Sequence, residues 1–86
     1  MTDNEYILEV WETVQKDLDY RLPTPWRFKF LPAMGDNGID SYEIFVELSD
    51  IRREFKISKN QIKKLYNRLF LEVSEMIITK NKRENL

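Results

Sequence analysis

The amino-acid sequence predicts a small α+β domain in which helices pack on one face of a two- to three-stranded sheet. Three observations predict this class: apolar residues at helical spacing near the start, an Asn-Gly turn followed by an alternating run, and a second helical run after Ser58. Spacings of three to four residues are typical of amphipathic helices, whereas strict alternation is typical of half-buried strands. Because 86 residues suffice for one small core, we expect a single domain over residues 1–80 and a polar tail or the start of a linker over 81–86.

The first helix is predicted by an apolar face close to the N-terminus. Thr2, Asp3 and Asn4 are suitable N-cap residues, and the helical spacing continues to about Asp19. Trp11 lies in the middle of this face, so its indole is either a core anchor or a contact surface. The face comprises Tyr6, Ile7, Val10, Trp11, Val14 and Leu18.

The next segment, residues 21–31, is ambiguous. Pro23 and Pro25 cannot both lie within one regular helix, although Pro25 can occupy the first turn of a second short helix. Residues 26–31 alternate as Trp-Arg-Phe-Lys-Phe-Leu, which fits a strand as well as a short helix. Aromatic rings between basic side chains can stack on single-stranded bases, but the same alternation arises when one face of a strand is buried. The pattern alone leaves these alternatives open.

A chain reversal is predicted at residues 35–38, Gly-Asp-Asn-Gly. Asn37 and Gly38 both tolerate positive φ, which is typical of tight turns. The spacing of the two glycines also occurs in a phosphate-binding loop of RNA-binding domains, but Asp36 would repel a phosphate, so a turn is the preferred interpretation. The run that follows is the clearest strand, since one of its faces carries Tyr42, Ile44, Val46 and Leu48.

Helical residues are predicted directly after this strand. Ser49 can cap a helix, and Asp50 at the first position complements the helix dipole. Ile51 and Phe55 are four residues apart, which would place both side chains on the inner face of that helix.

A second helix start is predicted within the same region, at Ser58. The run Ser58-Lys-Asn-Gln61 has the form of a capping box, and this box can break the long helical region. Residues 76–79 contain β-branched side chains and favour a short final strand. The expected element order is therefore helix, helix, strand, strand, helix, strand. The apolar stripe after the capping box consists of Ile62, Leu65, Leu69 and Val73.

The composition argues against several classes of function. The chain contains no cysteine and no histidine, which removes disulfides, thiolate metal sites and the commonest general base near neutral pH. Its serines lie in no recognisable nucleophile motif, so we expect no catalytic residue, no metal and no other cofactor. No apolar run approaches the about 20 residues of a membrane span, and the N-terminus differs from a signal peptide. We therefore expect a cytoplasmic protein that binds neither a membrane nor a small-molecule substrate.

Charge is divided unevenly along the chain. Residues 1–50 contain 4 basic and 11 acidic side chains, whereas residues 51–86 contain 10 basic and 4 acidic ones, so the net charges are -7 and +6. Such a distribution can steer a charged partner, or a second copy that docks head to tail. The basic half can equally be the solvated face of a helix.

Taken together, these elements resemble the N-terminal domain of the bacterial replication initiator DnaA, from about Tyr6 to Thr79. The likeness rests on Val10-Trp11, Leu22-Pro23, Phe30-Leu31 and the alternating strand, followed by the cap Ser49 with Ile51 and Phe55 behind it. The chain departs from the family in three respects. Glu47-Leu48-Ser49 stands where the family usually has Ala-Pro-Asn, and phenylalanine replaces two tryptophans found in many members. The acidic residue that some members use to meet the replicative helicase would fall near Trp26, where this chain has no acidic side chain.

The resemblance implies a KH-like fold and a non-catalytic domain of a replication initiator. Such a domain associates with copies of itself and recruits the replicative helicase or regulators of initiation, while nucleic acid is bound only weakly or through the rest of the chain. Trp11 falls at the self-association contact, and Ile51 falls at the position used for helicase contact. Both side chains can instead be buried in the core.

A helix-turn-helix regulator of transcription is the main alternative, because residues 50–68 resemble that DNA-binding unit. Lysine can neutralise phosphates and asparagine can pair with adenine. Against this alternative, Arg52 stands where the unit needs a small residue and Lys56 stands where it usually has glycine. A third class, a small free-standing inhibitor or adaptor, also stays open. The side chains that a helix-turn-helix would direct at DNA are Ser58, Lys59, Asn60, Lys63, Lys64 and Asn67.

Overall fold

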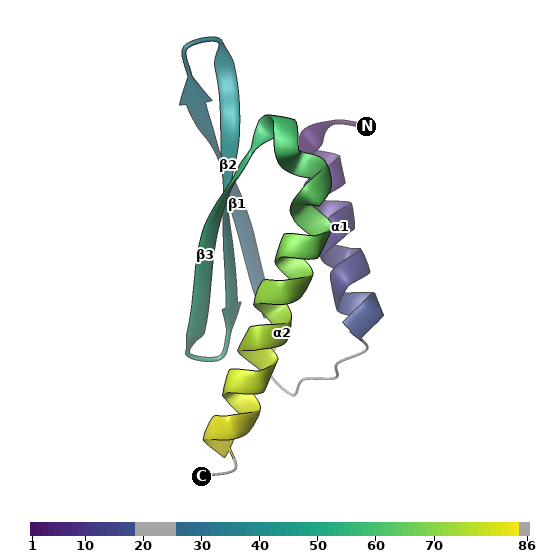
Figure 1. Ribbon diagram of the computed structural model, residues 1–86, viewed down its shortest axis with the longest axis vertical. Helices are drawn as coiled ribbons and strands as arrows, with labels where there is room; N and C mark the ends of the chain where they lie inside the picture. Colours follow the sequence, from purple (N-terminus) through teal and green to yellow (C-terminus); the bar gives the residue numbers. More distant parts are fainter. Residues whose placement is uncertain (19–25, 85–86) are drawn as a thin grey trace.

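The computed structural model describes residues 1–18 and 26–84 (Figure 1). Helix α1 (Asp3–Leu18) is followed by three strands, β1 (Trp26–Gly35), β2 (Gly38–Leu48) and β3 (Ile51–Ser58). A short 3₁₀ helix, η1 (Lys59–Lys64), then leads directly into the long helix α2 (Leu65–Glu84). The chain is thus a small α+β fold, in which two helices pack with a three-stranded sheet.

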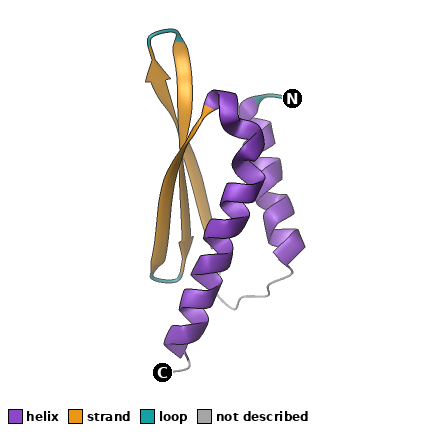
Figure 2. Cartoon of the chain, viewed as in Figure 1, coloured by secondary structure: helices purple, strands orange, loops and turns teal. Residues whose placement is uncertain are grey.

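The sheet is an antiparallel meander in the order β1-β2-β3, so β1 and β3 are its two edges. Both helices lie on the same side of the sheet, as Figure 2 shows. This two-layer arrangement confirms the predicted fold class, with helices on one face of the sheet. The opposite face of the sheet is uncovered among the described residues.

The core lies between the helices and the inner face of the sheet. Alternate residues of β2 point inward, and the helices contribute residues three or four positions apart, as the two periodicities require. Each Å² of apolar surface removed from water contributes about 25 cal/mol to the free energy of folding. This layer is therefore the main source of stability. The side chains with no more than 1% exposure are Ile7, Val14, Ile44, Val46, Leu48, Leu65, Leu69, Val73 and Met76.

The β1–β2 hairpin is long and extends beyond the end of β3. β3 ends at Ser58, which pairs with Ser41, whereas β1 and β2 continue to the pair Gly35 and Gly38. Gly38 has a φ of 109°, a conformation that L side chains rarely adopt. The predicted reversal at residues 35–38 and the predicted strand at residues 42–48 are both confirmed.

The element order differs from the prediction after Leu48. Residues 51–58 form strand β3 rather than a helix capped by Ser49, and the order is α-β-β-β-α, with η1 before the last helix. Ser49 and Asp50 instead form the tight connection between β2 and β3, where Leu48 pairs with Ile51 and Ser49 has a φ of 58°. A helix start was indicated correctly at Ser58, although its side chain makes no capping hydrogen bond.

Three further expectations are resolved. Residues 26–31, which fitted a strand or a helix, lie in strand β1. Residues 76–79 were expected to be a strand but belong to α2. Met76 continues the buried stripe of Leu69 and Val73, and this burial overrides the β preference of the neighbouring residues. The same helix continues to Glu84, so residues 81–84 are helical. The expected second helix partly falls on residues 19–25, which lie outside the described residues.

Candidate functional site

A groove of about 500 Å³ runs between β3 and the helix that packs behind it. We call it the basic groove. Its volume falls within the range of about 300–1,000 Å³ that is typical of binding clefts. It is lined by Lys56, Ile57, Ser58, Gln61, Lys64, Asn67, Arg68 and Leu71.

The local fold explains why these side chains meet. Strand β3 ends at Ser58 and the chain turns through η1, so the helical residues return along the strand they have just left. Lys64, Arg68 and Leu71 are spaced by four and three residues, which places them along one face of a helix. Leu71 leaves 55% of its surface exposed, so the groove combines an accessible apolar side chain with basic ones.

The cations of the groove differ in how they are paired. Within residues 1–18 and 26–84, no ion pair involves Lys56 or Lys64. Arg68 pairs with Glu72 at 3.3 Å from Nε to Oε1, and its guanidinium carbon lies 5.0 Å from the ring centre of Phe55. The two lysines therefore carry positive charge that an incoming anionic group can neutralise, whereas Arg68 is held in place by its neighbours.

The helix-turn-helix prediction is wrong, because its first helix is strand β3. Three of its candidate residues, Ser58, Lys64 and Asn67, line the basic groove. Lys59 lies 3.9 Å from a carboxylate oxygen of Asp3, from Nζ to Oδ2. The remaining candidates, Asn60 and Lys63, are exposed and do not line the groove.

The sequence did not single out Lys56, Arg68 or Leu71 as binding residues. Arg68 and Leu71 follow Lys64 at the spacing of one helix face, which is a signal that could have added them. Lys56 joins them only because β3 lies beside α2 in the folded chain.

The two residues implied by the initiator resemblance lie against the core. Trp11 is partly buried and stacks on Phe28, with 4.7 Å between ring centroids and 8° between ring planes. Its ring also meets the edge of Trp26 at 5.9 Å. Ile51 opens strand β3 and is only 7% exposed, so it does not begin a helix as predicted. The aromatic rings of β1 likewise pack against the core cluster, while Arg27 and Lys29 are exposed.

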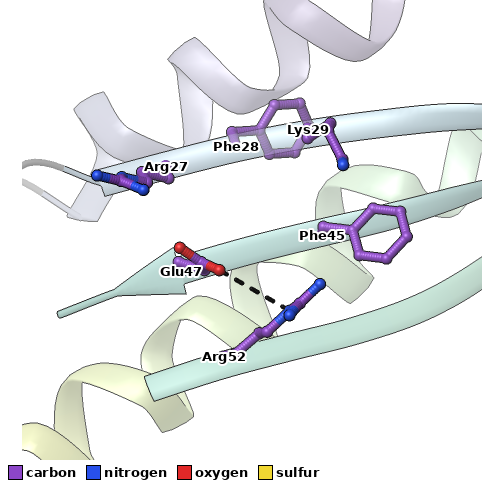
Figure 3. A pocket seen from close by; sticks show the side chains of 6 residues that line it. All are labelled: Arg27, Phe28, Lys29, Phe45, Glu47 and Arg52. Carbon is purple, nitrogen blue, oxygen red and sulfur yellow. Dashed lines mark ion pairs between the residues drawn. The ribbon is translucent and has the colours of Figure 1, made fainter. Parts of the chain in front are cut away.

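The outer face of the sheet carries a second, smaller hollow of about 280 Å³ (Figure 3). Phe45 lies within it, with Lys29 Nζ 5.2 Å and the Arg52 guanidinium carbon 5.9 Å from its ring centre. Arg52 also pairs with Glu54 at 3.1 Å and with Glu47 at 3.8 Å. Arg52 is thus neutralised by two glutamates, whereas no ion pair within residues 1–18 and 26–84 involves Arg27 or Lys29.

Two tyrosine hydroxyls hold α1 to the rest of the domain. Tyr42 donates a hydrogen bond of 2.9 Å to Asp3 Oδ2, and Tyr66 donates one to Asp17 Oδ2. Burial, followed by the bond to Asp3, raises the pKa of Tyr42, and the bond to Asp17 raises the pKa of Tyr66. Both groups are therefore neutral donors that fix α1.

The described part of the chain contains neither a metal-binding cluster nor a membrane-spanning helix. No cluster of three or more acidic side chains there has the geometry to hold a metal ion. None of the helices in that part combines the length and apolar character needed to span a bilayer.

Comparisons with protein-family models, with curated proteins and with solved structures gave no match for this chain. The groove and its neighbours therefore carry the functional argument.

Proposed function

We propose that this chain is a non-catalytic, cytoplasmic protein-interaction domain whose partner docks in the basic groove. The observation that carries the proposal is the combination, in one groove beside an edge strand, of two cations without ion pairs and an exposed leucine. Apolar contact supplies affinity, and charge selects the partner. An acidic protein segment with apolar residues satisfies both requirements.

The charge of the rest of the molecule favours a short acidic segment over a long polyanion. Helix α1 carries acidic side chains at Asp3, Glu5 and Glu9, and residues 1–50 have a net charge of -7. An extended duplex would bring phosphates toward this acidic half, because duplexes carry one charge per about 1.7 Å. A peptide confined to the groove meets Lys56 and Lys64 without approaching α1 closely.

The resemblance to the initiator domain gives this proposal a more specific form. In that form the partner is the replicative helicase or a regulator of initiation, and copies of the chain also associate with one another. The observed order α-β-β-β-α departs from the order that the resemblance implies, and Ile51 offers only 7% of its surface to a partner. We therefore base the proposal on the groove, and sedimentation of the purified chain tests self-association separately.

Duplex nucleic acid is a second candidate, favoured by the gathering of Lys56, Lys64 and Arg68 in one groove. It would be held through phosphates rather than through a recognition helix. Steep loss of binding with added salt would be its signature.

Peptide selection tests the proposal. We expect a random peptide library displayed on phage to yield ligands rich in Asp and Glu with interspersed apolar residues. The variant K56E/K64E should bind these ligands about tenfold more weakly, since two attractive charges become repulsive. The control K16E/K82E makes the same change in net charge at exposed residues outside the groove. Failure to enrich any acidic ligand, or equal loss in both variants, would contradict the proposal.

A further inference from the structure

Resting on the proposed function, we infer that the partner segment binds in extended form, as a fourth strand added to the β3 edge. β3 has β2 on one side only, so its other side carries the backbone groups of an edge strand. Such groups are a template for an incoming extended chain. The basic groove runs along this same edge, because Lys56, Ile57 and Ser58 of β3 line it.

The side chains beside the edge specify what the added strand must carry. On the outer face of the sheet, an acidic residue would lie beside Lys56, and opposite charges on neighbouring strands attract each other. On the inner face, an apolar residue would cover Ile57 and Leu71, both of which line the groove. Glu54, on the same outer face, is already paired with Arg52 at 3.1 Å, so Lys56 is the cation there that an added strand can neutralise. Around Lys56 and Ile57 the chemistry therefore selects a segment that alternates acidic and apolar side chains, the period that a strand requires.

The other edge of the sheet is less suited to this role. β1 contains Pro32, which has no backbone N–H and interrupts any ladder of hydrogen bonds along that edge. β3, Ile-Arg-Arg-Glu-Phe-Lys-Ile-Ser, contains neither proline nor glycine. Strand addition is therefore directed to β3.

Charge also explains why β3 would take a foreign segment rather than a second copy of itself. If two copies docked with their basic grooves side by side, Lys64 and Arg68 of one copy would lie near the same cations of the other. Like charges in such a position repel, which is a common protection of edge strands. An acidic segment meets attraction at the same place.

The test uses an eight-residue peptide, as long as β3, that alternates Glu and Val and is blocked at both ends. In an added strand, the N–H groups of alternate residues point to one edge, so only one set contacts β3. Two modified peptides are compared, one N-methylated at all Val amides and the other at all Glu amides. One of the two should bind about tenfold or more weakly than the unmodified peptide, and the affinity of the other should change less than about threefold. Amide hydrogen exchange within residues 51–58 should slow when the unmodified peptide binds.

The outcomes separate this inference from the proposed function. Binding that is indifferent to both N-methylated sets, or that leaves exchange in β3 unchanged, would overturn strand addition while the groove still serves as a docking site. Failure of the alternating peptide to bind would also overturn strand addition, and the phage selection decides the proposed function independently. Binding of duplex DNA or RNA, but not of the peptide, would overturn both.

Discussion

The two edges of the sheet are built differently, and the difference separates stability from binding. At the β1 edge, Phe28 stacks on Trp11 of α1 and Trp26 meets the same indole edge-on. At the β3 edge, a groove of about 500 Å³ separates the strand from the rim of the helix behind it. Aromatic rings fill the first edge, whereas cations line the second.

This contrast assigns the two edges of the sheet different tasks. The aromatic contacts at β1 are internal, and partly buried rings of this kind contribute to folding. Lys56 and Lys64 make no ion pair with any residue that the structure describes, so their charge does little for folding. Four variants test this division, from the largest expected effect on stability to the smallest.

Trp11→Ala should have the largest effect. Removal of the indole leaves Phe28 and Trp26 without their shared contact, and we expect a loss of about 3 kcal/mol in the free energy of unfolding. Urea denaturation measures this loss, with Leu8→Ala, on the exposed side of α1, as the control. If Trp11→Ala instead abolished self-association in sedimentation without loss of stability, Trp11 would be a contact between copies.

Ile51→Ala should come next, with a loss of about 2 kcal/mol, because its side chain is 7% exposed at the start of β3. Ile78, which is 53% exposed on α2, provides a matched control when changed to alanine. Urea denaturation of both variants gives the comparison. Equal stability of the two variants would contradict the burial of Ile51.

Tyr42→Phe should lower stability by about 1 kcal/mol at neutral pH, because Asp3 loses its hydroxyl donor. Burial, followed by the bond to Asp3, raises the pKa of Tyr42 above the ordinary value of 10.0. The unfolded chain therefore releases this proton first as pH rises, so the contribution is complete below about pH 10 and disappears through the raised pKa. Denaturation at several alkaline pH values should show a smaller decline in Tyr42→Phe than in the parent chain.

K56E/K64E should leave the free energy of unfolding within about 0.5 kcal/mol of the parent chain, because neither lysine has an ion pair to lose. Thermal denaturation beside K16E/K82E measures the difference at equal net charge. A large loss of stability confined to K56E/K64E would show that the groove cations support the fold.

Much of the fold could be predicted from local patterns. The strand at residues 42–48 has uninterrupted alternation, and Asn37-Gly38 suits a tight reversal, so both predictions are confirmed. Strand β3 was missed because Ile51 and Phe55 are four residues apart, a spacing shared by helices and strands. Arg53, which lies between them on the same strand face, conceals the alternation.

The connection before β3 was misread for a related reason. Ser49 and Asp50 are common at helix N-caps, yet here they join two strands, and Ser49 adopts a positive φ. Local sequence favours the cap, whereas the pairing of β3 with β2 favours the turn, and tertiary pairing prevails.

The candidate site was less accessible to sequence reasoning than the fold. Ser58, Lys64 and Asn67 were selected for a different unit, yet they line the groove. Lys56 and Leu71 are distant along the chain and meet only when the last helix returns beside β3. Lys64, Arg68 and Leu71 keep a helical spacing, but that spacing does not reveal that Lys56 of another element lies beside them.

The most direct measurement is a titration of the isotope-labelled chain with the alternating Glu and Val peptide, followed by backbone amide chemical shifts. We predict that the shifts concentrate in residues 51–71 and saturate with added peptide, and that binding is strongly weakened in K56E/K64E but not in K16E/K82E. Shifts centred instead on Phe45 and the outer face of the sheet, or equal responses in the two variants, would contradict it.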